Sequence, residues 1–478
     1  MDTFGTTETA IIIGVIALYI LGTSWLTAKL RSKNSGEFMV GGRATPAVVI
    51  GVLMMSEFIG SKSTIGVAQA AFDSGMAAMW AVLTAAFAFL LFGKFMAGRL
   101  YATGEVTISG AIAQRYGRTA QLLVSLIMIY ALLLVNVGNY VSGAAAIATV
   151  TKTSIPTAAF LIAIVSTFYF ALGGMKSIAY VSLLHTGLKY VGVFIILGTA
   201  LYMSKGMGPV MDKLPPYYFT LDGHIGWGTI VAFFIGNIGA VFTTQFIMQA
   251  ISATKSARAA KSSAYISAVL CIPISIALGL IGVIAKFLFP EMKSLFALPI
   301  FMQHMNVYLA ATVAVSLVAS VFLGVSTVAL AIASLVVKDF YVPIAKPTPE
   351  RELQVTRLLS VAIGFLPLVF VFFAPGLLKL SFFTRALRLS LAVVAMIGFF
   401  MPFFNGSRGA VIGLVASVIG TTAWYLLGDP LGIDNMYVAL AIPALVIVVE
   451  KVFHWRDGAA QISLHGHSAA VASHHEPH

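Results

Sequence analysis

Long, uniformly apolar segments recur along the whole chain and are separated by short polar stretches. About 20 apolar residues suffice for one helix to cross a membrane, and we expect about thirteen such spans. Transmembrane strands would instead alternate over about ten residues. The pattern predicts an all-α polytopic membrane protein, with residues 1–455 forming one transmembrane domain. The expected spans lie near 9–28, 45–70, 76–98, 120–150, 155–173, 178–202, 227–250, 263–289, 306–336, 355–374, 381–403, 408–427 and 435–453.

The composition agrees with this assignment. The 478 residues are 59% hydrophobic and 10% charged, whereas soluble domains carry about 25% charged residues. The net charge of +12 therefore indicates basic cytoplasmic loops rather than a nucleic-acid partner. The single cysteine, Cys271, excludes an internal disulfide and a cysteine-based metal cluster.

Basic residues gather in the loops that follow the odd-numbered spans, such as Lys29 to Arg43 and Lys255 to Lys261. The positive-inside rule then predicts an outside N-terminus and a cytoplasmic C-terminus, in a bacterial-type inner membrane. Residues 456–478 form a polar tail with several histidines. We expect this tail to be cytoplasmic and disordered, because its histidine spacing matches no fixed ligand set; metal binding is the alternative.

The second span contains an unusual polar stretch, MMSEFIGSKSTIG, at residues 54–66. Gly60 and Gly66 each weaken a helix by about 1 kcal/mol relative to alanine, and Lys62 within the membrane costs about 2.5–3.5 kcal/mol. A break here would expose peptide groups, which a bilayer tolerates only beside a polar cavity. Broken helices of this kind build the binding sites of many secondary transporters. A merely kinked helix with a Glu57–Lys62 pair is the alternative.

Six motifs, in order and at the right spacing, resemble those of the sodium:solute symporter family. That resemblance implies a LeuT-type fold with a 5+5 inverted-repeat core at about residues 45–403. It also implies a solute site beside the break, alternating access and sodium coupling. The motifs are FMVGGRATP, GVLMMSEFIGSKSTIGVAQAAFDSG, TISGAIAQRYGRTAQLL, FTTQFIMQAISATKSARAAKSSA, SLVVKDFY and FFNGSRGAVIGL.

The resemblance also implies positions for the solute. Lys62 falls where sugar-transporting members have a substrate-binding acid, which argues against neutral sugars and for an anion such as a monocarboxylate. Arg385 and Arg388 could attract anions too, although interfacial anchoring explains them equally well. The implied substrate-binding residues are Glu57, Gly60, Lys62, Ser63 and Gln249.

The sodium site implied by the resemblance is degraded. Carbonyls of Ser56 and Ile59 would bind the ion together with three groups of the ninth span, which fall on Ser320, Leu323 and Gly324. Leucine and glycine stand at the two hydroxyl positions. A local register shift that brings in Ser326 and Thr327 would restore them.

The sixth span offers a substitute for sodium. Ser182, His185 and Lys189 share one helical face, and Lys189 lies about 18 Å deep at 1.5 Å per residue. In some transporters of this fold, a lysine on this helix replaces sodium and makes transport sodium-independent or proton-coupled. The alternative is that Lys189 extends toward a polar loop.

Together these features predict a secondary active transporter of a small organic solute, coupled to Na⁺ or H⁺ and lacking an organic cofactor. A membrane sensor is the second hypothesis; because the chain ends about 25 residues after its last span, we expect such a sensor to depend on a partner. No metalloprotease, nucleotide-binding or hydrolase motif is present in the sequence, so we expect no enzyme.

Overall fold

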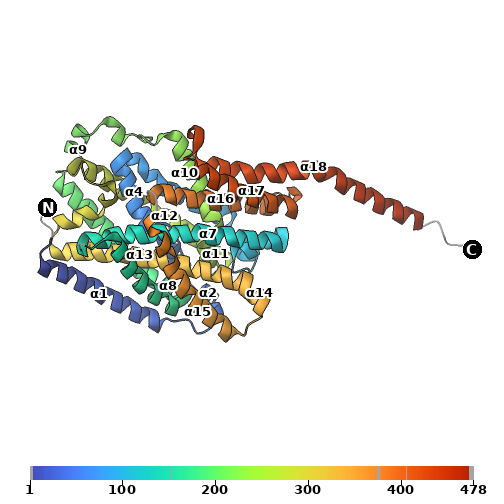
Figure 1. The fold of residues 1–478 in the computed structure, drawn as a ribbon, viewed down its shortest axis with the longest axis horizontal. Helices are drawn as coiled ribbons and strands as arrows, with labels where there is room; N and C mark the ends of the chain where they lie inside the picture. Colours follow the sequence, from blue (N-terminus) through green and yellow to red (C-terminus); the bar gives the residue numbers. More distant parts are fainter. Residues whose placement is uncertain (1–3, 152, 374–376, 405, 473–478) are drawn as a thin grey trace, which may run out of the picture.

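The computed structural model describes residues 4–151, 153–373, 377–404 and 406–472. These residues form a bundle of helices that run mostly along the long axis of the molecule (Figure 1). The helices are α1 (Thr6–Lys29), α2 (Ser35–Val40), α3 (Ala47–Phe58), α4 (Ser61–Ser74), α5 (Trp80–Phe95), α6 (Ala97–Ala102), α7 (Ile108–Thr151), α8 (Ile155–Met203), α9 (Gly208–Lys213), α10 (Gly226–Thr243), α11 (Gln245–Ser252), α12 (Ala257–Leu288), α13 (Val307–Leu335), α14 (Val342–Ala345), α15 (Pro349–Phe365), α16 (Leu377–Phe400), α17 (Ser407–Leu426) and α18 (Asn435–Ala472).

Within the described ranges, eleven helices are long and apolar enough to cross a membrane, and the bent pair α3–α4 makes a twelfth span. The expected span at 155–173 corresponds to a shorter apolar helix, Ile155–Thr167, at the start of α8. Gly174, at φ 70°, separates it from the rest of α8. A Cβ there would lie 2.8 Å from the Phe38 Cα, so the bend needs glycine.

The predicted break in the second span is present. Helix α3 ends at Phe58, α4 begins at Ser61, and their axes differ by 50°. Thr64 Oγ1 donates to the Gly60 carbonyl at 3.0 Å, and Ser63 Oγ donates to the Phe58 carbonyl at 3.3 Å. The hydroxyl groups of this polar stretch thus hydrogen-bond peptide groups next to the break.

A second break separates α10 from α11 at Thr244, where ψ is 131°. The backbone is irregular at these two breaks, and the candidate site described below lies beside them. Helix α13 lies between them and the outer helices: every residue of its apolar window is buried, against 11% of the α1 window. Helix α1 therefore faces the lipid, and α13 forms the core.

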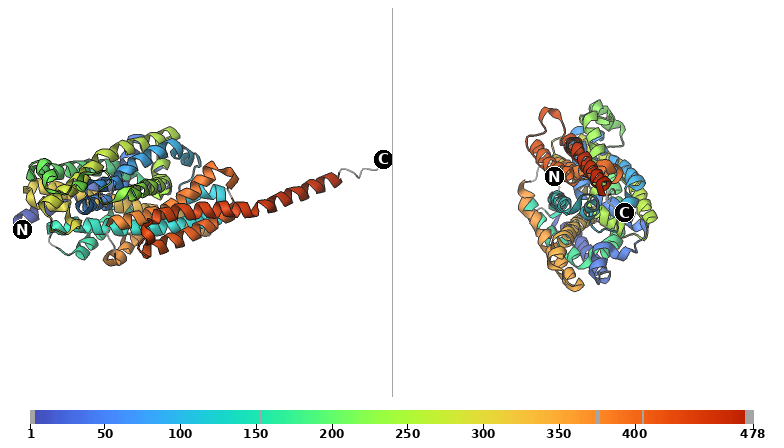
Figure 2. Two further views of the ribbon diagram at one scale, coloured as in Figure 1. Left: turned by 90° about the horizontal axis from the view of Figure 1, so that it is seen from above. Right: turned by 90° about the vertical axis from the view of Figure 1, so that its right-hand side faces the viewer.

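The last helix extends beyond the bundle. Helix α18 continues to Ala472, and it projects from the end opposite to the start of α1 (Figures 1 and 2). The sequence instead predicts a disordered tail over residues 456–478. Of that segment, 473–478 and the tail side chains lie outside the described residues, so its disorder and any metal binding stay predictions.

Candidate substrate and cation sites

Lys189 of α8 reaches into the break between α3 and α4. Its ammonium donates to the Ser56 carbonyl at 2.8 Å, to Ser56 Oγ at 2.9 Å and to the Ile59 carbonyl at 2.7 Å. An ammonium has three donors, and each finds an acceptor here. The side chain is 1% exposed, so it points into the protein and not toward a polar loop.

The ninth-span positions have other partners. Helix α13 is continuous from Val307 to Leu335, so the register shift that would restore the hydroxyl ligands is absent. Ser320 Oγ donates to the Ser316 carbonyl at 3.0 Å, and Ser326 Oγ to the Phe322 carbonyl at 2.5 Å. These two hydroxyls therefore satisfy carbonyls of their own helix.

Two further ninth-span groups lie beside the solute site. The Thr327 hydroxyl is hydrogen-bonded to the Glu57 carboxyl, and it also lies 2.8 Å from the Leu323 carbonyl. A Cβ added to Gly324 would lie 3.1 Å from the Asn139 amide nitrogen. Glycine therefore allows α7 and α13 to approach closely at the level of the break.

The other two candidates of the sixth span are also buried, but they serve different contacts. The His185 Nδ1 atom is hydrogen-bonded to the Tyr19 hydroxyl, and the two rings meet edge to face with centroids 5.8 Å apart. Ser182 Oγ donates to the Ala179 carbonyl at 2.6 Å. Of the three side chains, Lys189 alone reaches the break, while the hydrogen bond of His185 connects α8 to α1.

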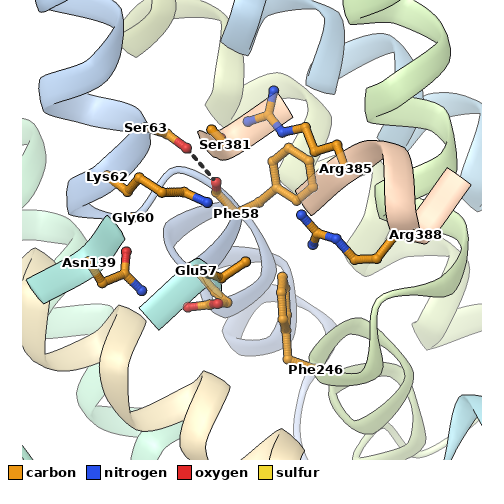
Figure 3. Close-up of a pocket in the computed structure, with 11 residues that line it drawn as sticks. Glu57, Phe58, Gly60, Lys62, Ser63, Asn139, Phe246, Ser381, Arg385 and Arg388 are labelled. Atoms are coloured by element: carbon orange, nitrogen blue, oxygen red, sulfur yellow. Dashed lines mark hydrogen bonds between the residues drawn. The ribbon is translucent and has the colours of Figure 1, made fainter. Parts of the chain in front are cut away.

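A cavity of about 20 Å³ lies beside Gly60 (Figure 3). It has room for about one water molecule, so the surrounding helices would have to separate before an organic solute could enter. Helices α3, α4, α7, α11 and α16 all contribute. The lining residues are Glu57, Phe58, Gly60, Lys62, Ser63, Val135, Asn139, Phe246, Ser381, Arg385 and Arg388.

Three cationic side chains and one carboxyl group surround this cavity (Figure 3). Lys62, Glu57, Arg385 and Arg388 are each at most 5% exposed. Within the described residues, Lys62 makes no hydrogen bond or ion pair. The Glu57–Lys62 ion pair that would explain both residues structurally is therefore not formed.

The two arginines are held without a carboxylate partner among the described residues. Arg385 Nη1 donates to the Ala81 carbonyl at 3.0 Å, and its Cζ lies 4.5 Å from the Phe382 ring and 5.3 Å from the Phe58 ring. Arg388 Nη1 donates to Thr244 Oγ1, at the second break, at 2.9 Å. Burial rules out the interfacial anchoring that the sequence left open for these arginines.

Gln249 does not line the cavity. Its amide nitrogen donates to Ser334 Oγ at 2.7 Å and to the Met39 carbonyl at 3.2 Å, so it connects α11 to α13 and α2. Asn139 of α7, by contrast, lines the cavity. Its Nδ2 atom donates to Asn136 Oδ1 at 3.3 Å.

A wider chamber of about 430 Å³ adjoins this site. Stacked rings of Phe233 and Phe382, 4.1 Å apart, line its floor, and Lys379 and Asp434 line it too. Burial raises the pKa of the Asp434 carboxyl, against a hydrogen bond from the Met436 amide. Because Phe382 also contacts Arg385, these aromatic rings separate the chamber from the small cavity.

A family model, the sodium:solute symporter family, matches residues 38–417. The chain belongs to the sodium:solute symporter family. Membership makes it a membrane transport protein and not an enzyme, and the family implies a solute and a sodium coupling ion.

Curated relatives are distant. The human high affinity choline transporter 1 is 24% identical over 289 residues, which is 58% of this chain and 49% of that protein. The Xenopus laevis sodium-coupled monocarboxylate transporter 1 is 22% identical over 257 residues, which is 52% of this chain and 41% of that protein. The chain thus spans about half the length of the curated relatives it matches.

Solved structures support the LeuT-type fold. A Na⁺-coupled sialic acid symporter in a substrate-bound outward-open state superposes with a TM-score of 0.78 at 18% identity, covering 94% of this chain and 98% of that one. A nucleobase-cation-symport-1 family transporter superposes with a TM-score of 0.55 at 17% identity, covering 86% and 94%. The predicted architecture with broken helices is confirmed.

Proposed function

We propose that this family member transports a small organic anion, such as a monocarboxylate, by alternating access. The charge balance of the small cavity carries the proposal: Lys62, Arg385 and Arg388 outnumber the single carboxyl of Glu57. Buried charges are expensive unless they are paired. A monocarboxylate solute would reduce the formal charge of the cavity, which is +3 from the three cations and −1 from Glu57, from +2 to +1.

The geometry of the donors favours a carboxylate. A guanidinium can present two parallel N–H donors to a carboxylate, and the Lys62 ammonium has no other hydrogen-bond acceptor among the described residues. The names of the relatives do not decide between solutes, since choline is a cation and a monocarboxylate an anion. The proposal therefore depends on the cavity itself.

Access would proceed in two steps. A solute would first enter the 430 Å³ chamber. It would move on to the small cavity when the rings of Phe382 and Phe233 separate. Beyond the break, the Ser35–Glu352 hydrogen bond joins α2 to α15, and the Lys338–Glu352 ion pair at 2.6 Å joins α15 to the segment Val336–Tyr341 that follows α13. These contacts would have to open for release on the other side. By the positive-inside rule that release side is the cytoplasm, in an inner membrane.

We propose further that Lys189 replaces the sodium ion. The two carbonyls that the family resemblance assigns to sodium, those of Ser56 and Ile59, both accept from its ammonium. Loss of one proton would remove the charge from this position, as the exit of a sodium ion would. Transport would then be sodium-independent or driven by protons.

Uptake into proteoliposomes tests the solute class. We expect the wild type to accumulate a labelled monocarboxylate, and not a neutral sugar or choline, and Lys62→Gln to lose this uptake. Lys286→Gln is the matched control, since Lys286 contacts the Phe72 ring outside the small cavity. Uptake of a sugar or of choline with no carboxylate uptake would contradict the anion proposal.

A further inference from the structure

A second, wholly different pocket lies between α10, α16 and α18. It is a groove of about 500 Å³, within the size range of small-ligand pockets, about 300–1,000 Å³. Among the described residues, no polar or charged side chain lines it. The lining residues are Ile235, Ile238, Gly239, Phe242, Leu389, Ala392, Val393, Met396, Ile397, Met401, Leu440, Ala444 and Val448.

The walls of the groove are fixed at one end. Tyr437 of α18 donates its hydroxyl to the Gly228 carbonyl of α10 at 2.8 Å. A Cβ added to Gly236 would lie 2.7 Å from the Met436 sulfur, so α10 and α18 touch there. The groove lies next to this junction, between α10 and α18, with α16 as its third wall. A Cβ added to Gly239 would lie 2.6 Å from the Leu389 Cα of that wall, so glycine lets α10 approach α16 closely.

The groove opens to the outside of the protein within the membrane-spanning part of the chain. All three helices are candidate spans, and the wall residues Leu440 and Val448 are 37% and 41% exposed. In a bilayer, this apolar opening faces hydrocarbon, because polar groups are excluded at that depth. A lipid acyl chain matches the chemistry of the lining.

Basic side chains stand at the open end of the groove. Arg99 donates to the Phe399 carbonyl at 3.2 Å, and its Cζ lies 3.9 Å from the Phe400 ring. In the sequence, these two phenylalanines lie between the groove residues Ile397 and Met401. The Arg115 Cζ lies 5.8 Å from the Phe399 ring.

A third cation, Lys451, follows the groove residue Val448 on α18, and its Nζ lies 4.8 Å from the Phe403 ring. The neighbouring acid, Glu450, lies against Gly406 and Gly409 at the start of α17. The rim of the groove therefore carries more positive than negative charge.

We propose that this groove binds an acyl chain of an anionic phospholipid, with its phosphate near Arg99, Arg115 and Lys451. Basic sites at membrane-helix ends recognise anionic headgroups, and a phosphate accepts strong hydrogen bonds from guanidinium groups. A second copy of the chain would bring an identical basic rim to the same place, which charge repulsion disfavours. The lipid would lie against α16 close to Arg385 and Arg388, because the groove residues Leu389 and Ala392 follow these arginines by one helical turn.

Native mass spectrometry of the full chain in detergent tests this site, with phosphatidylglycerol and phosphatidylcholine as probes. We expect the wild type to retain phosphatidylglycerol in preference. Ala444→Phe should abolish retention by filling the groove. Lys451→Gln should weaken retention about fivefold, since a basic residue near the surface is worth about 1 kcal/mol. Arg99→Gln with Lys451→Gln should weaken it further.

Two matched controls keep the test specific. Ile419→Phe changes an exposed apolar position of α17, and Lys94→Gln removes an exposed cation that lies over Phe95; both should retain the lipid like the wild type. Equal retention of the two phospholipids, or wild-type retention in the Lys451→Gln and Arg99→Gln variants, would overturn the proposal. A dimer that Ala444→Phe dissociates would assign the groove to a second copy instead.

Discussion

Two buried lysines flank the same break, and they have opposite surroundings. Lys189, 1% exposed, gives all three of its donors to oxygens of the α3 end. Lys62, 5% exposed, has no hydrogen-bond or ion-pair partner among the described residues and projects into a cavity with two arginines. The Lys189 ammonium therefore has an acceptor for each of its donors, whereas the Lys62 ammonium has none among the described residues.

This difference is the reason why we propose different roles for the two lysines. A saturated ammonium behaves as a built-in cation, because it satisfies peptide carbonyls that would otherwise need an ion. An unpaired ammonium is costly in a membrane interior, so it is retained where a counter-charge arrives from outside. In the mechanism we propose, Lys189 is an internal cation and Lys62 belongs to the binding site of an anion.

The largest effect should come from removing the unpaired charge. We expect Lys62→Gln to weaken carboxylate binding by about 100-fold, since truncating one partner of a buried charge pair costs about 2–5 kcal/mol. Isothermal titration of the purified protein measures this, with Lys286→Gln as the control. If Lys62→Gln binds the carboxylate with wild-type affinity, Lys62 does not bind the solute, and the two lysines do not differ in the way we propose.

The next effect concerns the saturated lysine. Lys189→Ala leaves the carbonyls of Ser56 and Ile59 buried without a donor, at about 1–3 kcal/mol for each unsatisfied group. We expect a lower thermal midpoint and partial recovery of that midpoint when NaCl replaces KCl, because sodium would enter the vacated space. A Lys189→Ala protein that melts like the wild type in both salts would contradict the internal-cation assignment.

A smaller effect should distinguish charge from geometry at the arginines. Arg388→Lys keeps the positive charge but loses the planar pair of donors, and we expect about tenfold weaker carboxylate binding. Arg385→Lys should also lose the contacts with the Phe58 and Phe382 rings. Binding that is unchanged in both variants would show that only the summed charge matters.

The smallest effect is expected at Gln249, which lies outside the cavity and is hydrogen-bonded to Ser334. Gln249→Ala should leave the equilibrium affinity for the solute within about twofold, while altering transport rate, since the amide joins α11 to α13. Paired binding and uptake measurements separate these two quantities. A loss of affinity comparable to that of Lys62→Gln would return Gln249 to the solute site.

The sequence predicts local events better than long-range partners. Gly60, Gly66 and Lys62 predict the break, and helical periodicity predicts that Ser182, His185 and Lys189 share one face. The partner of a side chain depends on tertiary packing: the Gln249 amide meets Ser334, and Thr327 meets Glu57, across segments far apart in the chain.

How deeply a side chain lies within the helix bundle is equally hard to predict from one sequence. Arg385 and Arg388 lie near the end of an apolar run, where an interfacial position and a buried one have the same sequence pattern. The second break, at Thr244, has no glycine beside it and no charged residue to mark it. Both features become visible only in the folded chain, where α16 packs against α10 and Arg388 is hydrogen-bonded to Thr244.

Uptake of a labelled monocarboxylate into proteoliposomes under imposed gradients tests the central claim most directly. The wild type and Lys189→Ala are compared with an inward proton gradient, an inward sodium gradient, and neither. We predict that the wild type responds to protons and ignores sodium, and that Lys189→Ala loses the proton response. Wild-type uptake that strictly requires sodium, with the same sodium dependence in Lys189→Ala, would contradict the account.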